Sequence, residues 1–129
     1  MIVPVLTQLR PDHEPDLEFF FKVCGYPYDP EQPFNPDNTL LAFYQGQLVG
    51  FVTCWTDGQP YAFVDGLLVH PDFRRTGIGY HLAHAIKGVV MQRGAFAIKC
   101  IVTNPELVAI LERVGFQRNG VAMEWINKE

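Results

Sequence analysis

Charged side chains are scarce in this sequence, and their scarcity excludes several classes of protein. Lys, Arg, Asp and Glu make up 19% of the 129 residues, and the formal net charge is −4. Disordered chains combine high charge with low hydrophobicity, whereas this chain is 48% apolar. An acidic chain also lacks the broad positive surface by which many proteins bind nucleic acid. We therefore expect one compact domain over residues 1–129, without a nucleic-acid partner.

Cysteines are few, and their spacing matches neither a metal site nor a disulfide framework. Cys24, Cys54 and Cys100 are odd in number and include no C-x-x-C pair. Free thiols in a reducing compartment are therefore expected, with no bound metal. No apolar run reaches the roughly 18 residues of a membrane span, and Pro4 and Pro11 interrupt the start of the chain, where a signal peptide would lie. These absences predict a cytoplasmic protein with no membrane partner.

The first third of the chain predicts a strand, a helix and a long irregular loop. Alternating β-branched and aliphatic residues indicate a strand over residues 2–9. Acidic residues at the start, an apolar middle and a closing Gly25 predict a helix over 14–24. Prolines then recur at every third position from Pro27 to Pro36, which favours an extended segment. This segment is either a rigid surface connection or the lining of a substrate cleft.

The remaining chain alternates strand and helix signals. We expect strands over 39–44 and 48–55, joined by a hairpin turn at 45–47, and then a turn at 57–60 and a strand over 61–69. A helix over 78–91 and a strand over 96–102 follow. Asn104 then opens a helix that runs to Val114, and a last strand covers 121–126. Simple alternation along strand 61–69 would place Tyr61, Phe63, Asp65, Leu67 and Val69 on one face and Val64 and Leu68 on the other. The order of elements indicates an α/β (α+β) fold with a mixed, mostly antiparallel sheet flanked by helices.

The segment Arg74-Arg75-Thr76-Gly77-Ile78-Gly79 predicts a site for a phosphate group. It lies between a predicted strand and the start of a predicted helix, where the first amide N–H groups have no partner within the helix. Two glycines allow an anion to approach the backbone closely, and two arginines supply positive charge and forked donors. The spacing is not G-x-x-x-x-G-K-[ST], which excludes a P-loop nucleotide triphosphatase. It is not G-x-G-x-x-G either, so a dinucleotide-binding site is poorly supported.

With the preceding Leu67-Leu68-Val69-His70-Pro71, this R-x-x-G-x-G segment resembles the coenzyme A site of the GNAT superfamily of N-acetyltransferases. A second segment, Asn104 followed by Leu111-Glu112-Arg113-Val114-Gly115-Phe116, is similar to that family's "N-x-x-A-x-x-L-Y-E-K-x-G-F" motif. The resemblance covers about residues 40–116. It implies a GNAT-like sheet that splays at the fourth strand, and acetyl-CoA as co-substrate.

The resemblance also implies which residues bind acetyl-CoA. Backbone groups of Leu67, Leu68 and Val69 would contact the pantetheine arm, and Asn104 would contact it as well. The pyrophosphate would be held mainly by main-chain N–H groups of the loop and the first helical turn, from Arg74, Arg75, Thr76, Gly77, Ile78, Gly79 and Tyr80. The implied activity is direct transfer of an acetyl or other acyl group from acetyl-CoA to a primary amine.

The sequence departs from the family at both proton-transfer positions. Leu111 occupies the place of the Tyr that often serves as general acid, and leucine cannot donate a proton. Tyr80 and Tyr61 are conceivable substitutes, although packing roles suit them better. Phe63 aligns with the Glu that serves some members as base, which leaves Asp65, two residues further on, as the candidate base. Asp65 could instead cap or bridge neighbouring strands, and the sequence leaves that choice open.

The acceptor is not specified by any motif. Seven acidic residues and a single Lys lie in the segment that holds the first helix and the Pro-rich loop. This charge favours a cationic acceptor, either a small-molecule amine or a protein lysine or N-terminus, or is an ordinary solvated face. The missing Tyr and Glu leave a second hypothesis, a catalytically silent module that binds coenzyme A or a protein partner. A homodimer is left open as well.

Overall fold

The computed structural model describes residues 2–56 and 60–127 of the chain. Its strands are β1 (Val5–Gln8), β2 (Thr39–Tyr44), β3 (Gln47–Trp55), β4 (Tyr61–Val69) and β5 (Ala97–Lys99). Its α-helices are α1 (Glu14–Cys24), α2 (Ile78–Gln92) and α3 (Pro105–Arg113), and short 3-10 turns span Pro11–His13, Pro36–Asn38 and Pro71–Phe73. The helices agree with the predicted ranges to within one residue. Acidic residues in the first turn and a glycine after the last turn mark the ends of α1 and α3 in the sequence, and the apolar stripe of period four marks α2.

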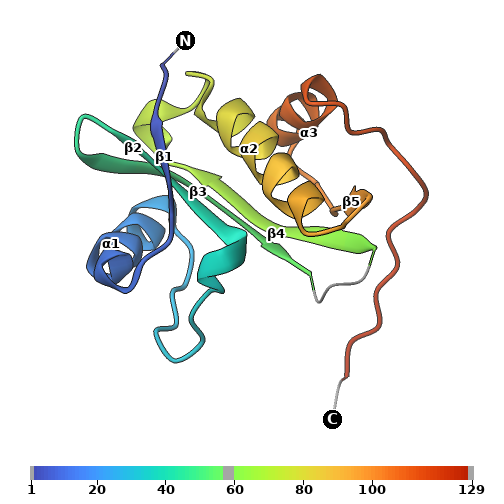
Figure 1. Ribbon diagram of the computed structural model, residues 1–129, viewed down its shortest axis with the longest axis horizontal. Coiled ribbons are helices and arrows are strands. Elements are labelled where there is room, and N and C mark those ends of the chain that lie inside the picture. The colour runs from blue at the N-terminus through green and yellow to red at the C-terminus, as the bar shows by residue number, and fades with distance from the viewer. Residues whose placement is uncertain (1, 57–59, 128–129) are drawn as a thin grey trace.

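The five strands form one mixed sheet in the order β1-β2-β3-β4-β5. The first four strands are antiparallel neighbours, and β5 runs parallel to β4 after the crossover through α2. Helix α1 covers one face of the sheet, while α2 and α3 cover the other (Figure 1). This arrangement confirms the predicted α/β fold with a mostly antiparallel sheet. Within the part of the chain that the structure describes, no helix combines the length and apolar character needed to cross a membrane.

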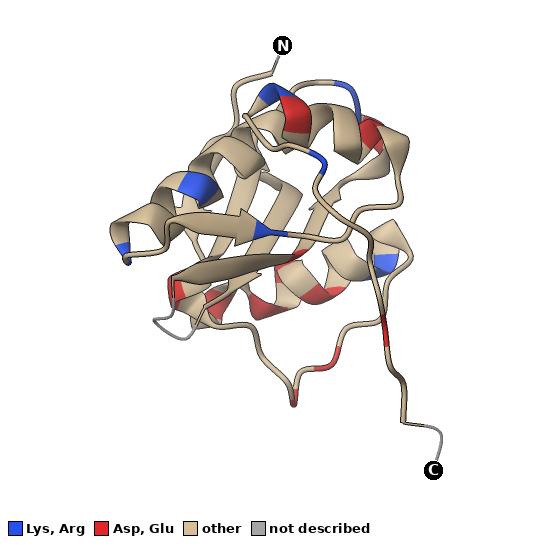
Figure 2. Ribbon diagram, turned by 90° about the vertical axis from the view of Figure 1, so that its right-hand side faces the viewer, with Lys and Arg blue, Asp and Glu red and all other residues tan. Residues whose placement is uncertain are grey.

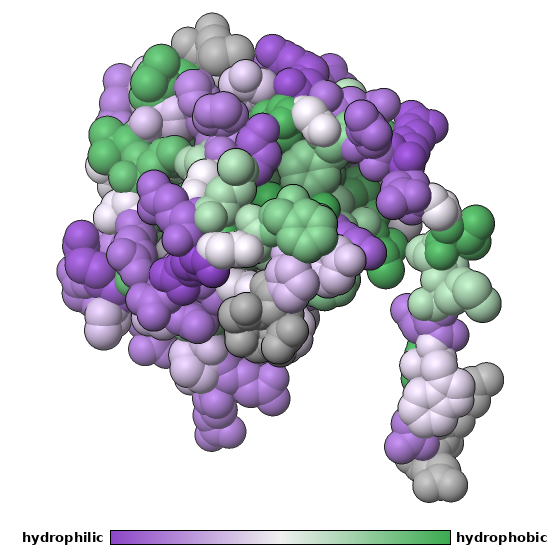
Figure 3. Space-filling view, turned by 45° about the vertical axis from the view of Figure 1, so that its right-hand side comes forward, coloured by the Kyte–Doolittle hydropathy of each residue, from purple (hydrophilic) through white to green (hydrophobic). Residues whose placement is uncertain are grey.

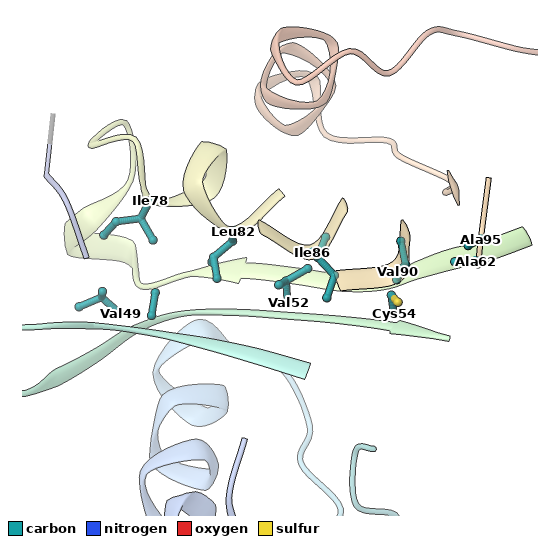
Figure 4. Close-up of a cluster of buried hydrophobic side chains, with 10 residues drawn as sticks. Val49, Val52, Cys54, Ala62, Ile78, Leu82, Ile86, Val90 and Ala95 are labelled. Carbon is teal, nitrogen blue, oxygen red and sulfur yellow. The ribbon is translucent and has the colours of Figure 1, made fainter. Parts of the chain in front are cut away.

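The larger hydrophobic core lies between α2 and the sheet (Figure 4). Ile78, Leu82, Ile86 and Val90 are the most buried residues of the α2 stripe, each no more than 1% exposed. They pack onto the buried side chains of β3, among them Val52 (Figure 4). Their spacing of four residues is the helical period that the sequence displays, so the stripe on this helix is core, as predicted. The packing fixes where α2 begins relative to the end of β4.

A smaller core lies under α1 on the opposite face of the sheet. Leu17, Phe20 and Phe21 of α1 pack against buried side chains of β2 and β3, including Phe51. The Pro-rich loop joins this cluster through Phe34, whose ring centroid lies 4.9 Å from that of Phe51. The loop is thus held against the domain by its aromatic residues rather than by regular secondary structure.

The predicted hairpin is confirmed. Gln45 and Gly46 form a two-residue turn with φ values of 51° and 79°, and β3 begins one residue earlier than predicted, at Gln47. Two consecutive positive φ values are the signature of the type I′ turn that matches the twist of antiparallel strands. The predicted turn at Asp57-Gly58-Gln59-Pro60 falls mostly outside the described residues.

The prediction of which residues share a face of β4 is wrong for the second half of the strand, because the strand contains a β-bulge. Thr53 pairs with Gly66 and Cys54 pairs with Val64, so Asp65 is an extra residue in β4. A bulge of one residue shifts the alternation by one position. Leu67 and Val69 therefore pack into the core under α2 together with Val64, whereas Leu68 joins the cluster under α1.

The sheet splays between β4 and β5. Only Tyr61, Ala62 and Phe63 of β4 pair with β5, opposite Ala97–Lys99. The predicted strand 96–102 is thus too long, because its apolar residues continue after the chain has left the sheet. Beyond Phe63 the edge of β4 that faces β5 carries no paired strand in the described chain, so its backbone groups are open to a ligand. This is the predicted opening at the fourth strand.

The predicted last strand over 121–126 is wrong. These residues are described, but they form no strand and run as an extended, exposed segment that stands away from the domain (Figure 1). Alternating apolar residues indicate that a segment suits a half-buried strand, yet the strand forms only if a partner strand pairs with it. Within residues 2–56 and 60–127, no strand pairs with this segment.

Candidate functional site

The loop between β4 and α2 has the backbone conformation of an anion-binding turn. Arg75 and Gly77 both adopt positive φ, 65° and 93°, and Gly77 is the residue from which α2 begins. A non-glycine residue in the left-handed region is uncommon and is concentrated at functional turns. Gly77 occupies the N-cap position without a side chain, so no side-chain oxygen competes for the first N–H groups of α2.

Several hydrogen bonds hold this loop in place. The side chain of Arg74 donates from Nε to the carbonyl oxygen of Val69 at 3.4 Å, and the hydroxyl of Thr76 donates to the carbonyl of Phe73. The N–H of Ile2 donates to the carbonyl of Thr76 at 2.8 Å, which ties the N-terminal segment to the loop. These contacts assign Arg74 and Thr76 a role in shaping the loop, while the guanidinium of Arg75 stays 83% exposed.

His70 closes the turn at the end of β4, as expected from its place before Pro71. Its ring Nδ1 accepts a hydrogen bond of 3.1 Å from the N–H of Asp72, and its backbone N–H donates to the carbonyl of Val49. The side chain is buried. This buried cap fixes the direction in which the chain leaves β4 and enters the loop.

Gly79 lies where three elements meet. A Cβ at this position would come within 3.0 Å of Ile110 on α3 and within 3.6 Å and 3.8 Å of Val69 and Leu67 on β4. The absence of a side chain therefore lets the first turn of α2 pack closely against both β4 and α3. Ile78, the preceding residue, is fully buried in the core. These two residues position the N–H groups of the helix start beside the open edge of β4.

The start of α3 lies next to the loop. Arg75 forms an ion pair with Glu106 at 2.9 Å, between the loop and the first turn of α3. Asn104 caps α3, since its side-chain oxygen accepts a hydrogen bond of 2.9 Å from the N–H of Glu106. Sequence reasoning missed Glu106, because the 31 residues that separate it from Arg75 hide their proximity. The side-chain oxygen of Asn104 is engaged in this cap, and its contact with the pantetheine arm stays a prediction.

Asp65 lies at the bulge of β4, just beyond the last residue that pairs with β5. Its side chain is exposed. Nearby positions carry an aromatic pair, Trp55 and Phe63, which are 57% and 42% exposed with ring centroids 6.2 Å apart. Large exposed aromatic rings beside a carboxylate are a surface that suits binding of an organic cation. The pair was not identified from the sequence, because only the register of β3 and β4 brings it together.

Leu111 and Tyr80 both belong to the packing between α2 and α3. Leu111, at the position of the family's general acid, is 5% exposed and packs against Ala83 and Val114. The ring of Tyr80 stacks on His84 at 6.2 Å between centroids, and the guanidinium of Arg113 lies 4.9 Å from its centre. Tyr80 thus has the packing surroundings that were expected for it.

Cys24 connects the end of α1 to the end of β4. Its Sγ lies 3.9 Å from the carbonyl oxygen of Val69, the same oxygen that Arg74 contacts. Burial raises the pKa of the Cys24 thiol, and the charge of Arg74 acts in the opposite direction. The protonated thiol is therefore the favoured form, which suits a structural donor better than a nucleophile. The three cysteines are all free thiols.

The residues present fit the phosphate-bearing end of coenzyme A. They provide N–H groups without partners in the helix at the start of the 15-residue α2, left-handed backbone at Arg75 and Gly77, and the exposed side chain of Arg75. The open backbone edge of β4 continues from this loop to the bulge at Asp65. The arrangement can hold an extended molecule with a diphosphate at one end and its other end beside a carboxylate.

Comparison with known proteins gives one family for this arrangement. Residues 6–116 match the model of the acetyltransferase (GNAT) family. No protein of curated function matches the sequence significantly.

Solved structures of similar fold are aligned over nearly the whole chain. A GNAT-family acetyltransferase from Streptococcus pneumoniae TIGR4 is 22% identical, with a TM-score of 0.79 and complete coverage of both chains. The aminoglycoside acetyltransferase AAC(6')-Iy, bound to a bisubstrate analogue of coenzyme A and acetylneamine, is 15% identical with a TM-score of 0.77 over 98% of this chain and 99% of that chain. An aminoglycoside acetyltransferase from an uncultured soil metagenomic sample is 16% identical, with a TM-score of 0.77 over 97% of both chains. Because these sequence identities are low, the similarity to the solved structures shows the fold alone.

Proposed function

Because the chain belongs to the acetyltransferase (GNAT) family, we propose that it transfers an acetyl group from acetyl-CoA directly to a primary amine. The family assignment makes it an N-acetyltransferase. The observation that supports the proposal most directly is the loop from Arg74 to Gly79, with its left-handed residues at the start of α2 and the open β4 edge beside it.

Acetyl-CoA would bind along the opening between β4 and β5. The N–H groups from Gly77 to Tyr80 would hold the pyrophosphate, aided by the charge of Arg75. Backbone groups of Leu67, Leu68 and Val69 would bind the pantetheine arm. When bound, acetyl-CoA supplies an acyl group already activated as a thioester. The protein positions that group beside the acceptor, and positioning alone can supply much of an enzyme's acceleration.

Asp65 is the residue that we propose as general base. It stands at the bulge where the open edge of β4 begins, and its exposed carboxylate can accept a proton from an incoming amine directly or through one water. The side chain of Leu111 has no polar group, which leaves the general-acid position without a proton donor. Departure of the coenzyme then relies on the stability of its own thiolate, because a thiol pKa near 8.5 makes a tolerable leaving group.

The proposed acceptor is a small cationic amine. Acidic side chains are spread along α1 and the loop that follows it, as the red segments of Figure 2 show. Glu14, Asp16, Glu18, Asp29, Glu31 and Asp37 are all exposed. These negative charges favour approach of a polyamine or an aminoglycoside-like amine. The cytoplasm is the proposed location, in keeping with the free thiols.

Steady-state turnover of acetyl-CoA with a panel of amines tests the proposal. Asp65→Asn should lower kcat on the best amine by about 10²- to 10⁴-fold, the usual contribution of a general base, and leave coenzyme A affinity unchanged. Asp72→Asn removes another exposed carboxylate after the same strand and should leave kcat unchanged. If the wild type bound coenzyme A tightly but acetylated none of the amines, the chain would instead be a catalytically silent coenzyme A module.

A further inference from the structure

A groove between the C-terminal end of α2 and the strands β1 and β2 has no part in the proposed coenzyme A site. This groove, called the α2 groove below, has a volume of about 350 Å³, which lies within the range of small-molecule sites. Its lining residues are Gln8, Asp37, Leu40, Val89, Gln92 and Arg93. β1 and β2 lie at the end of the sheet opposite to β5, so the α2 groove is distinct from the opening between β4 and β5.

Two opposite charges line the α2 groove without pairing to each other. Among the residues that the structure describes, the three ion pairs include neither Asp37 nor Arg93. Nη1 of Arg93 donates instead to Oδ1 of the buried Asn38 at 2.7 Å, and Oδ1 of Asp37 accepts a hydrogen bond of 3.3 Å from Nε2 of Gln8. Both charged groups are therefore oriented by neutral partners, which do not cancel their charge.

The rest of the α2 groove combines apolar surface with amide groups. Leu40 and Val89 are partly buried and pack against the larger hydrophobic core, so their positions are fixed. Gln8 and Gln92 are exposed, and their amides can both donate and accept hydrogen bonds. A ligand in the groove would thus find an apolar surface and neutral polar groups beside the two charges.

The charges of the α2 groove favour different parts of a ligand. The groove lies at the C-terminal end of α2, where the helix dipole adds partial negative charge. This charge and the carboxylate of Asp37 favour an ammonium group. The guanidinium of Arg93 uses one of its five N–H donors on Asn38, and its fork suits a carboxylate.

The α2 groove is open to a ligand from solution. The side chains of Gln8, Asp37, Gln92 and Arg93 are all exposed. The C-terminal segment over residues 121–127 stands away from the body of the domain (Figure 3), and none of its residues lines the groove.

We propose that the α2 groove binds a zwitterionic α-amino acid with a small apolar side chain. Its carboxylate would pair with the guanidinium of Arg93, and its ammonium group with the carboxylate of Asp37. Its side chain would cover Leu40 and Val89. A simple amine or a simple anion would leave one of the two charges unmatched, whereas a zwitterion matches both.

The amino acid would occupy a second site rather than the acceptor site. β3 and β4 separate the groove strands β1 and β2 from the open edge of β4, beside which acetyl-CoA is proposed to bind. The inference therefore goes beyond the proposed acetyl transfer and does not depend on it.

Titration of the isotope-labelled full chain with L-valine, followed by amide chemical shifts in NMR spectra, tests the proposal. Saturable shifts are expected at Gln8, Leu40 and Arg93. Isobutylamine lacks the carboxylate of valine, and isovalerate lacks its ammonium group. Each should bind about 10- to 100-fold more weakly than L-valine, the loss expected for one interaction with a charged group.

Variants of the two charged residues should separate the two ends of the ligand. Arg93→Gln keeps a donor for Asn38 and should weaken L-valine binding by about 10- to 100-fold without weakening isobutylamine binding. Asp37→Asn should weaken L-valine binding to a similar extent without weakening isovalerate binding. Arg118→Gln is the matched control, because this exposed guanidinium lies 3.6 Å from Glu112 on α3 and should leave all three affinities unchanged.

Three results would contradict the proposal. L-valine that caused no saturable shifts at its highest soluble concentration would exclude the site. Shifts at Phe63 and Asp65 instead of the α2 groove would place valine beside the proposed acceptor site. Equal affinities of the wild type for L-valine, isobutylamine and isovalerate would exclude recognition of a zwitterion, and this comparison needs no variant to fold. Coenzyme A binding and acetyl transfer, measured separately, can each fail without bearing on these results.

Discussion

At the scale of single residues, Gly77 carries the most specific requirement of the proposed cofactor site. Its φ of 93° lies in the left-handed region that favours glycine, and it is the N-cap of α2, where the proposed site would hold a phosphate. Gly77→Asp adds a negative charge at this point. The added carboxylate would repel the pyrophosphate and compete for the N–H groups of the helix start. Coenzyme A affinity, measured by calorimetry, should therefore fall by about 10- to 100-fold, a loss similar to that of one hydrogen bond to a charged group.

Gly46→Asp is the matched control for that substitution. Gly46 also has positive φ, 79°, but lies in the β2–β3 turn with nothing within 4 Å of an added Cβ. The control should lose stability on the order of 1 kcal/mol from backbone strain and keep its coenzyme A affinity. Equal affinity losses in both variants would mean that strain, rather than contact with phosphate, explains the effect.

Cys54 makes stability depend on pH above 9. Burial raises the pKa of this thiol from 9.0 to about 11, with the charge of Arg93 acting in the opposite direction. As pH rises through 9, the unfolded chain loses this proton while the folded chain keeps it. The folded state is therefore destabilised progressively between about pH 9 and pH 11, by a total of about 2–3 kcal/mol.

Denaturant unfolding of the wild type and of Cys54→Ala at several pH values checks this expectation. The Ala variant is less stable at pH 8 because it leaves a small cavity, but its stability should fall less steeply above pH 9. Identical slopes in the two proteins would show that another group dominates the alkaline loss.

At the scale of secondary-structure elements, Gly50 of β3 lies in the interface with α2, whereas Gly88 lies on the exposed face of α2. A Cβ on Gly50 of β3 would meet Leu82 at 2.7 Å and Ile78 at 2.9 Å, whereas one on Gly88 of α2 would meet nothing within 4 Å. Gly50→Ala should therefore lower the free energy of unfolding by about 1–3 kcal/mol through overpacking. Gly88→Ala should raise it by up to about 1 kcal/mol, because alanine favours helix.

Chemical denaturation of the two variants gives both values under one set of conditions. Ile78 is the first residue of α2. Because Gly50→Ala would displace Ile78, it should also weaken coenzyme A binding, whereas Gly88→Ala should not. A neutral effect of Gly50→Ala on stability would contradict the close approach of α2 and β3.

Much of the element order could be predicted because its signals are local. Gly25 ends α1 in the left-handed conformation, and Asn104 followed by Pro105 starts α3, as the residue types indicate. The bulge at Asp65 and the missing strand at 121–126 could not be predicted, because both depend on pairing between distant segments. The loop that we propose for the cofactor could be identified for the same reason as the helices, since it consists of consecutive residues. The ion pair of Arg75 with Glu106 exists only in the folded chain.

At the scale of the whole molecule, the acidic face around α1 should control which amines bind. Negative charge attracts a polyamine more strongly than a monoamine, and added salt screens this attraction. The KM for a polyamine such as spermidine should therefore rise several-fold as ionic strength increases from about 0.01 M to 1 M, where the Debye length falls from roughly 30 Å to 3 Å. The KM for a hydroxylated monoamine should change less.

Charge-neutralising variants assign this effect to one face. Glu18→Gln with Glu31→Gln should raise the polyamine KM at low salt and flatten its salt dependence. Glu112→Gln on α3 removes a carboxylate on the other side of the sheet and should have little effect. Salt dependence that persisted unchanged in the double variant would show that the acidic face is only a solvated surface.

The narrow attachment between β4 and β5 has a consequence for how the native state fluctuates. Only three residue pairs join β5 to the sheet, so β5 and α3 should open locally at a lower free energy than the β1–β4 sheet. A molecule bound between β4 and α3 would have to be released for this opening to occur. By mass action, the bound molecule would then slow amide hydrogen exchange in β5 and α3 more than in β2 and β3. A bound co-substrate would thus stabilise the C-terminal third of the fold against local opening.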